Sequence, residues 1–142
     1  MTTATTDIEL GGIQIRFLVD ADESQGAATV FECRVAPGAT VPGPHSHDGF
    51  EETVYGIEGV TTFTVDGETM EIGPRNALCI RRGQVHRFVN DGDVAATFVS
   101  VATPGVFVPD YFNEIRAVLT AGGPPDINAI FNVMRRHGLT PA

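Results

Sequence analysis

Short apolar or alternating segments, each ended by glycine, proline, asparagine or aspartate, fill the chain from residue 12 to about residue 103. They are rich in β-branched and aromatic residues, as in GIQIRFLVD, ATVFECRVAPG and AATFVSVATP. Such residues favour strands, and many short strands with closely spaced turns favour a sandwich or barrel over a parallel sheet with helices. We therefore expect an all-β fold, with a barrel over residues 12–103.

Two turn sequences predict which of these strands pair. In TVDGETMEI, the dipeptide Asp66-Gly67 separates two strand-like segments, and Asp-Gly is a frequent two-residue hairpin turn. The sequence NDGD, residues 90–93, follows the strand-like HRFV and predicts a second hairpin for the same reason.

The pattern becomes helical after the last strand-like segment. In PDYFNEIRAVLTAGG, the apolar residues Phe112, Ile115 and Leu119 share one helical face. Asp110 is the expected N-cap of this helix, and Gly122 is its expected stop.

A second helical segment follows in PPDINAIFNVMRRHG. Its apolar residues recur at the i, i+3, i+4, i+7 spacing of one face: Ile127, Ile130, Phe131 and Met134. Asp126 precedes this pattern as a cap, and Gly138 ends it. We expect two short C-terminal α-helices, within about residues 109–138, to pack on the barrel.

Length and charge exclude several classes of protein. At 142 residues the chain is expected to form a single domain, residues 1–142, with a core of its own. All nine basic residues are arginines, so a Schiff base or a lysine base is excluded. The net charge is −9, and Arg116, Arg135 and Arg136 are too few for a DNA-reading helix pair, so no nucleic-acid partner is expected.

Hydropathy and cysteine content indicate in which cellular compartment the protein is expected. The sequence has no run of 18 or more apolar residues and has a polar beginning, MTTATTDIELGG, so we expect a soluble cytoplasmic protein with no membrane partner. Cys33 and Cys79 each lie alone in an apolar segment. We expect both to be buried, reduced thiols, because a cytosolic domain of this size needs no disulfide.

Histidines and carboxylates concentrate in PHSHDGFEETVYGIEG, residues 44–59. His45 and His47 are two residues apart and would face the same way on a strand. With one carboxylate, from Glu51 or Glu52, they form either a metal site or a polar loop. Strand parity turns one of the two glutamates inward, but the hydrophobic pattern does not decide which.

A fourth candidate ligand, His86, lies downstream in RRGQVHRFVN, where Phe88 and Asn90 share its face. If this strand neighbours the first, all four side chains converge inside a barrel. Three imidazoles and a carboxylate are costly to bury unless they are paired or bound to a metal. We therefore favour a metal site over a polar loop with one core histidine.

The arrangement resembles the cupin family, whose first motif is Gly-x(5)-His-x-His-x(3,4)-Glu-x(6)-Gly and whose second is Gly-x(5)-Pro-x-Gly-x(2)-His-x(3)-Asn. The matching residues are Gly38, His45, His47, Glu52 and Gly59, then Gly83, His86 and Asn90. Gly38 lies one residue further from His45 than the motif specifies. Arg75 and Arg81 replace the glycine and the proline that lead the second motif. These differences concern turn geometry and leave the ligand types intact.

The resemblance implies a double-stranded β-helix, or jelly-roll, barrel, and its spacing to Gly59 selects Glu52 over Glu51. It implies one divalent transition metal (Fe, Mn or Ni, with Zn also compatible) held by His45, His47, Glu52 and His86. Glu51 would then be solvated or would support a ligand. By the same resemblance Glu52 would act as the catalytic base, and the chain would form a homodimer.

The helical tail ending in MRRHGLTP is similar to the tails of bacterial quercetin-dioxygenase-like cupins. This similarity implies a metal-dependent dioxygenase that acts on a small enolisable or phenolic molecule. Two alternatives stay open. One is a non-oxidative lyase, isomerase or decarboxylase on the same site, and the other is a barrel that binds a small ligand without catalysis.

Other residues have a structural interpretation first. His137 lies in the last turn of the second expected helix, where a partial positive charge suits the dipole. Arg81 and Arg82 would either hold an anionic substrate or be solvated at a strand end. Four phenylalanines would either line the pocket or fill the core: Phe63, Phe88, Phe107 and Phe112.

Overall fold

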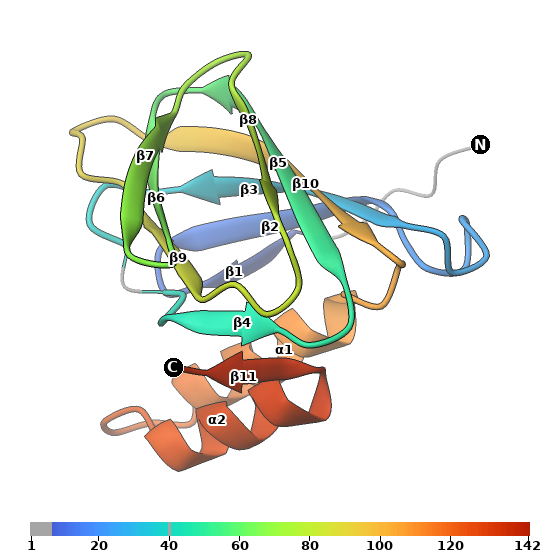
Figure 1. The fold of residues 1–142 in the computed structure, drawn as a ribbon. Helices are drawn as coiled ribbons and strands as arrows, with labels where there is room; N and C mark the ends of the chain where they lie inside the picture. Colours follow the sequence, from blue (N-terminus) through green and yellow to red (C-terminus); the bar gives the residue numbers. More distant parts are fainter. Residues whose placement is uncertain (1–6, 40) are drawn as a thin grey trace.

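The computed structural model describes residues 7–39 and 41–142. Two antiparallel β-sheets face each other as a barrel, and two helices lie below one end of it (Figure 1). The strands are β1 (Ile8–Leu10), β2 (Ile13–Val19), β3 (Thr29–Val35), β4 (His45–His47), β5 (Glu51–Glu58), β6 (Thr61–Val65), β7 (Glu68–Ile72), β8 (Ala77–Ile80), β9 (His86–Val89), β10 (Ala96–Thr103) and β11 (Leu139–Pro141). The helices are α1 (Pro109–Leu119) and α2 (Ile127–Arg136).

One sheet has the order β1-β2-β3-β10-β5-β8, and the other has the order β11-β4-β9-β6-β7. Consecutive strands such as β3 and β4 lie in different sheets, so the chain passes back and forth between the two layers. The expected all-β jelly roll with two C-terminal helices is confirmed. The strands extend beyond residues 12–103 on both sides, because β1 begins earlier and β11 follows the helices.

One of the two predicted hairpins forms. β6 and β7 pair through Asp66 and Gly67, whose φ angles of 48° and 83° suit a tight hairpin turn. The prediction for residues 90–93 is wrong, because they carry the chain from β9 in one sheet to β10 in the other. The side chain of Asn90 holds this crossing by donating from Nδ2 to the carbonyl oxygen of Val35 at 3.0 Å. A local turn pattern does not reveal such a long-range hydrogen bond.

Aromatic rings fill much of the space between the sheets. One cluster contains Phe17, Phe31, Phe107 and Phe112. A second cluster contains Phe63, Phe88 and Phe98. Phe112 lies on α1, so its ring contacts with Phe17 and Phe31 fasten the helix to the barrel. Burial of one such side chain stabilises the fold by about 1.5–3 kcal/mol.

The two helices start by different means. α1 begins at Pro109, and its N-cap is Val108 rather than the predicted Asp110. Proline at the first helical position has its φ preset, so the helix starts there and Asp110 falls within the first turn. α2 starts as predicted, because Asp126 Oδ1 accepts a hydrogen bond from the backbone N–H of Ala129 at 3.1 Å.

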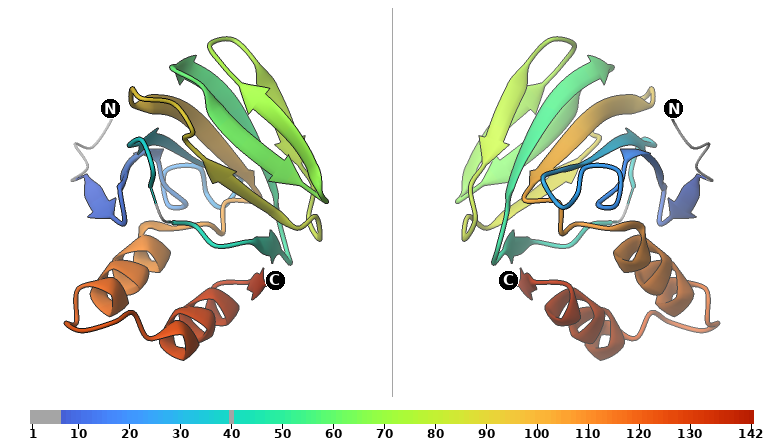
Figure 2. Two further views of the ribbon diagram at one scale, coloured as in Figure 1. Left: turned by 90° about the vertical axis from the view of Figure 1, so that its left-hand side faces the viewer. Right: turned by 90° about the vertical axis from the view of Figure 1, so that its right-hand side faces the viewer.

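The helices cover one end of the barrel, beneath β4 and β11 (Figure 2). α1 buries Tyr111, Phe112 and Ile115. On α2, Met134 is buried but Ile127 is 55% exposed, so its predicted apolar face is only partly covered. Within the described residues, neither helix is long and apolar enough to cross a membrane.

β11 adds a strand that the sequence did not predict. It pairs antiparallel with β4, with Leu139 opposite His47 and Pro141 opposite His45. The side chain of Leu139 is fully buried. Three residues are too few to show the alternation by which strands are recognised.

The two cysteines have different environments. Cys33 on β3 is buried, as predicted, whereas Cys79 on β8 is exposed. The prediction of a buried Cys79 is wrong because β8 is an edge strand whose outward positions face solvent. Both thiols are free.

The turn between β7 and β8 keeps a conformation typical of glycine. Arg75 has a φ of 71°, in the left-handed region, at the position where the sequence motif has glycine. Its backbone N–H donates to the carbonyl oxygen of Gly56 on β5 at 2.9 Å. Arg75 therefore adopts at this turn the left-handed conformation that glycine favours.

Candidate metal centre

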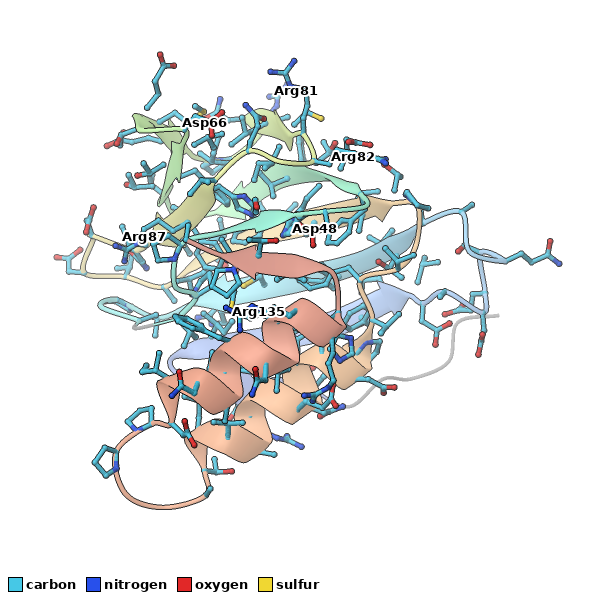
Figure 3. The ribbon with its side chains drawn as sticks, turned by 60° about the horizontal axis from the view of Figure 1, so that its bottom comes forward. Asp48, Asp66, Arg81, Arg82, Arg87 and Arg135 are labelled. Atoms are coloured by element: carbon cyan, nitrogen blue, oxygen red, sulfur yellow. The ribbon has the colours of Figure 1, made fainter. Side chains whose placement is uncertain are left out.

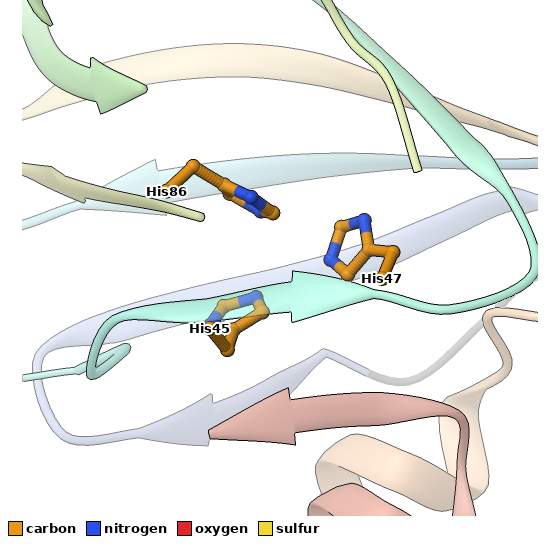
Figure 4. Close-up of side chains that lie close together, drawn as sticks. All are labelled: His45, His47 and His86. Carbon is orange, nitrogen blue, oxygen red and sulfur yellow. The ribbon is translucent and has the colours of Figure 1, made fainter. Parts of the chain in front are cut away.

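Three histidines from two distant segments point toward one another inside the barrel (Figure 4). His45 and His47 face inward from β4, and His86 at the start of β9 lies directly opposite His45. One ligand nitrogen from each lies within 4.8 Å of the others. All three side chains are buried.

Backbone carbonyls orient two of these rings. His45 Nδ1 lies 2.8 Å from the carbonyl oxygen of Gly43, and His86 Nδ1 lies 2.9 Å from that of Gln84. A carbonyl oxygen only accepts, so each Nδ1 carries the hydrogen and each Nε2 presents a lone pair. Within the described part of the chain, His86 Nε2 has no hydrogen-bond partner.

His47 is held by aromatic packing instead. Its ring stacks on Phe50, with 4.2 Å between the centroids and 17° between the planes. Neither of its nitrogens has a hydrogen-bond partner among the described residues. A buried polar atom without a partner costs about 1–3 kcal/mol, so unpartnered nitrogens of this kind are expected where a ligand binds.

The structure separates the two candidate glutamates. Glu52 is 8% exposed, and its Oε1 lies 3.8 Å from the Nε2 atoms of both His47 and His86. Its Oε2 accepts a hydrogen bond from Ser100 Oγ on β10 at 2.5 Å. Glu51 turns to the opposite face, where the Nε and Nη2 atoms of Arg82 each donate to it at 2.6 Å.

Burial shifts the protonation of this cluster. It lowers the pKa of His45 to about 4 and that of His47 to about 2, and the neighbouring imidazoles add to both shifts. Burial raises the pKa of Glu52, while His86 and the Ser100 hydroxyl act in the opposite direction. His45 and His47 are therefore neutral near pH 7, which is the form that binds metals. Buried neutral imidazoles with a facing carboxylate fit a divalent transition metal.

These shifts predict how the stability of the metal-free protein depends on pH. Between pH 6.5 and about 4, unfolded His45 and His47 bind protons that the folded protein excludes. The free energy of unfolding should therefore fall as the pH falls through this range, by about 1.4 kcal/mol per pH unit for each histidine. Glu52 opposes this trend, because its raised pKa makes the folded state bind a proton more tightly. Urea titrations in the presence of a chelator measure the slope.

The variant Glu52→Gln isolates the contribution of the two histidines to the pH dependence of the free energy of unfolding. Without the opposing carboxyl group, the free energy of unfolding should depend more steeply on pH between 6.5 and 4.5 than in the wild type. Equal slopes in the two proteins would show that burial does not shift the pKa of Glu52.

An inner pocket of about 40 Å³ adjoins the cluster. His45, His86 and Glu52 supply its polar lining, and the rest is mainly aromatic and aliphatic. Phe107 and Phe112 therefore both fill the core and line this pocket, and the partly buried Phe88 also lines it, whereas Phe63 belongs to the core and not to this lining. No arginine belongs to the lining among the described residues.

The two arginines near the site in sequence lie elsewhere in space. Arg81 lies at the end of the barrel far from the helices (Figure 3). Arg82 is exposed and bonded to Glu51, so its charge is directed away from the pocket. Of the two expectations for this pair, solvation at a strand end fits the structure and contact with a bound anion does not.

Three further residues reach the site that the sequence did not mark as site residues. Ser100 bonds to Glu52, while Cys33 and Tyr111 line the inner pocket. Burial raises the pKa of both Cys33 and Tyr111, so neither is ionised near neutral pH. Ser100 could have been noticed, because it shares a strand face with the apolar Phe98 and Ala102 in the strand-like sequence ATFVSVAT. No local signal marks Tyr111, which lies on α1.

The sequence profile of the Cupin domain matches residues 31–102, about half of the chain. The chain belongs to the cupin family. The matched range of this cupin contains all four expected ligands but ends before α1, so the helices lie outside the matched region.

One curated relative of this cupin is the tetracenomycin polyketide synthase protein TcmJ from Streptomyces glaucescens, 36% identical over 83 residues. The match covers 57% of this chain and 55% of TcmJ, so the chain spans about half the length of that relative.

Solved structures share the fold. KdgF from Halomonas sp. is 19% identical with a TM-score of 0.60, and the match covers 70% of this chain and 84% of that one. A sugar phosphate isomerase of the cupin superfamily from Silicibacter pomeroyi is 28% identical with a TM-score of 0.56, over 65% of this chain and 59% of that one. A predicted oxalate decarboxylase from Thermotoga maritima is 22% identical with a TM-score of 0.61, over 65% and 80% respectively.

Proposed function

We propose that this cupin is a metal-dependent enzyme in which His45, His47, Glu52 and His86 hold one divalent transition metal, Fe, Mn or Ni, with Zn also compatible. The observation that supports this proposal best is the set of unpartnered nitrogens on buried His47 and His86, which face a buried carboxylate. In a single domain with the barrel around the site and the helices at its end, these ligands lie out of bulk solvent.

The lining of the inner pocket favours an uncharged substrate with an oxygen-bearing group. A sugar phosphate would need cationic partners for its phosphate, and no described arginine lines the pocket. An enol or a phenol needs only the metal and a base at one end and tolerates aromatic walls elsewhere. The 36% identity to a polyketide synthase protein agrees with a substrate of this class.

The chain supplies the base and the dry surroundings for the reaction. A bound metal would act as a Lewis acid and, if redox-active, would pass electrons to dioxygen. Glu52 would release the metal before it acts as a base, and its Oε1 would then accept the proton of the substrate hydroxyl while Oε2 stays bonded to Ser100. The aromatic lining would exclude water from the ionised substrate.

For the overall reaction we favour a quercetin-dioxygenase-like oxidation of an enolisable or phenolic molecule. A non-oxidative isomerase, lyase or decarboxylase on the same site is the alternative. The 28% identity to a protein named as a sugar phosphate isomerase supports a non-oxidative reaction, but not a phosphorylated substrate, because no described arginine lines the pocket.

The test combines metal analysis with oxygen uptake. The protein would be prepared with Fe, Mn, Ni or Zn as the sole added metal and analysed for bound ion. Oxygen consumption would then be measured with a flavonol and a β-diketone. Glu52→Gln should lower turnover by about 10²–10⁴-fold, whereas Ser100→Ala, which leaves the carboxylate in place, should lower it less.

The possible results separate the alternatives. Oxygen uptake supports the dioxygenase, and substrate turnover without oxygen uptake supports the non-oxidative enzyme. A retained, unaltered ligand without turnover supports a binding protein. A chain that takes up none of the four metals at micromolar concentration contradicts the proposal as a whole.

A further inference from the structure

A second hollow of about 400 Å³ lies between the barrel and the helices. The segment 41–44 forms one side of it, and apolar residues of α1 and α2 form the other. Those on α2 are Ile127, Ile130, Phe131 and Met134. This is the face predicted to be buried, and the hollow explains why Ile127 is 55% exposed.

This outer groove adjoins the inner pocket and shares part of its lining. Ile13, Pro42, Tyr111 and Phe112 line both of them. Tyr111 and Phe112 come from the first turn of α1 and Pro42 from the segment before β4, so the junction lies between the helix and the strand that carries His45.

The volumes decide what each part can hold. The inner pocket, about 40 Å³, has room for a few water molecules or one small group. Small-molecule sites usually measure about 300–1,000 Å³, and the outer groove falls within that range. A substrate that reaches the histidines with one oxygen-bearing end therefore has room for the rest of its structure in the outer groove.

The groove also restricts the chemistry of its occupant. None of its described lining residues is an aspartate, glutamate, arginine or histidine, although the chain has a net charge of −9. Its surface is aliphatic and aromatic, apart from the Tyr111 hydroxyl and the backbone. A groove of this kind favours an uncharged apolar molecule and disfavours a phosphorylated or polyanionic one.

From the shared lining, the volumes and the absence of charged side chains among the described lining residues, we infer that the outer groove binds the apolar body of the substrate, an uncharged fused-ring or extended molecule. Its oxygen-bearing end passes Tyr111 and Phe112 to reach the histidine cluster. That this molecule is the substrate rests on the function proposed above. Binding of an apolar molecule in the groove does not.

The test places a charge in the groove at a position where the fold tolerates it. Ile127→Asp introduces a carboxylate at the first residue of α2, where negative charge suits the helix dipole. Val94→Asp makes the same change at a valine that is 64% exposed and is not part of the groove. Ile127→Ser removes the apolar contact without adding charge. The probe is 2-naphthol, a fused-ring phenol that is uncharged near neutral pH, and equilibrium dialysis measures its binding to metal-free and metal-loaded protein.

Ile127→Asp should weaken 2-naphthol binding by about tenfold or more in both forms, and Ile127→Ser by a smaller factor. Val94→Asp should stay within about twofold of the wild type, since it touches nothing in the groove. Equal affinity in all four proteins would overturn the inference. The alternative occupant of the groove is a second copy of the chain, and light scattering tests it. A wild-type dimer that becomes monomeric in Ile127→Asp would assign the groove to that second copy and overturn the inference.

The two proposals fail in different ways. If the protein takes up no metal but binds 2-naphthol, with the predicted loss in Ile127→Asp, the proposed role of the groove is supported and the proposed enzyme is contradicted. If the wild type and Ile127→Asp both take up metal and oxidise a flavonol equally well, the proposed enzyme is supported and the proposed role of the groove is contradicted.

Discussion

Replacement of His47 by alanine is expected to weaken metal binding by more than about 100-fold, because loss of a residue that merely supports a ligand already costs 10–100-fold. His47 brings two unpartnered nitrogens into the cluster, one of them 3.8 Å from Glu52 Oε1. The remaining His45 and His86 are fixed by backbone carbonyls and cannot move to replace it. Competition with a chromogenic chelator, followed by elemental analysis, measures the affinity.

His137→Ala provides the matched control. His137 lies at the C-terminal end of α2, where its Nε2 bonds to Glu114, and it is not part of the cluster. This variant should bind metal as the wild type does. Full metal content in His47→Ala, or equal losses in the two variants, would contradict the proposed ligand set.

Replacement of Gly56 by alanine is expected to destabilise the fold by about 3 kcal/mol or more, at the upper end of the range for overpacked positions. A Cβ atom at Gly56 would lie 1.9 Å from the carbonyl oxygen of Gly73 and 2.7 Å from its carbonyl carbon. Both contacts are with backbone, so no side-chain rotation relieves them. The N–H of Gly56 also donates to the carbonyl oxygen of Asn76 at 2.9 Å, which holds the two segments together. Urea denaturation at pH 7 measures the loss.

Gly49→Ala is the control for this change. Gly49 lies between β4 and β5, where an added Cβ has no neighbour within 4 Å. It should change the free energy of unfolding by less than about 1 kcal/mol. Wild-type stability in Gly56→Ala would show that β5 and the turn after β7 are less closely packed than the structure indicates.

The sequence predicted those features of the fold that depend on neighbouring residues. Alternation over a few residues identifies strands, the Asp66-Gly67 pair identifies one turn, and Asp126 identifies the start of α2. Features that depend on distant partners were missed or wrong. β11 requires β4 as a neighbour, and the crossing at residues 90–93 requires a carbonyl on β3.

The same distinction holds for the candidate site. The i, i+2 spacing of His45 and His47 was sufficient to place both on one face of a strand. The choice of Glu52 over Glu51 needed the spacing of the cupin motif, because alternation was compatible with either glutamate facing inward. Tyr111 could not be found at all, since its position in the pocket depends on how α1 packs against the barrel.

The pairing of β11 with β4 also has a consequence for the order in which the protein is made. His45 and His47 emerge from the ribosome long before Leu139, yet β4 has only β9 as a neighbour in its sheet until β11 arrives. Thr140 then donates to Asp48 at 2.7 Å, and the N–H of Asp48 donates to the carbonyl oxygen of Gly138 at 2.8 Å. The strand that carries two of the proposed ligands therefore gains its second neighbour only after residues 139–141 have been made, although the ligands themselves are made much earlier.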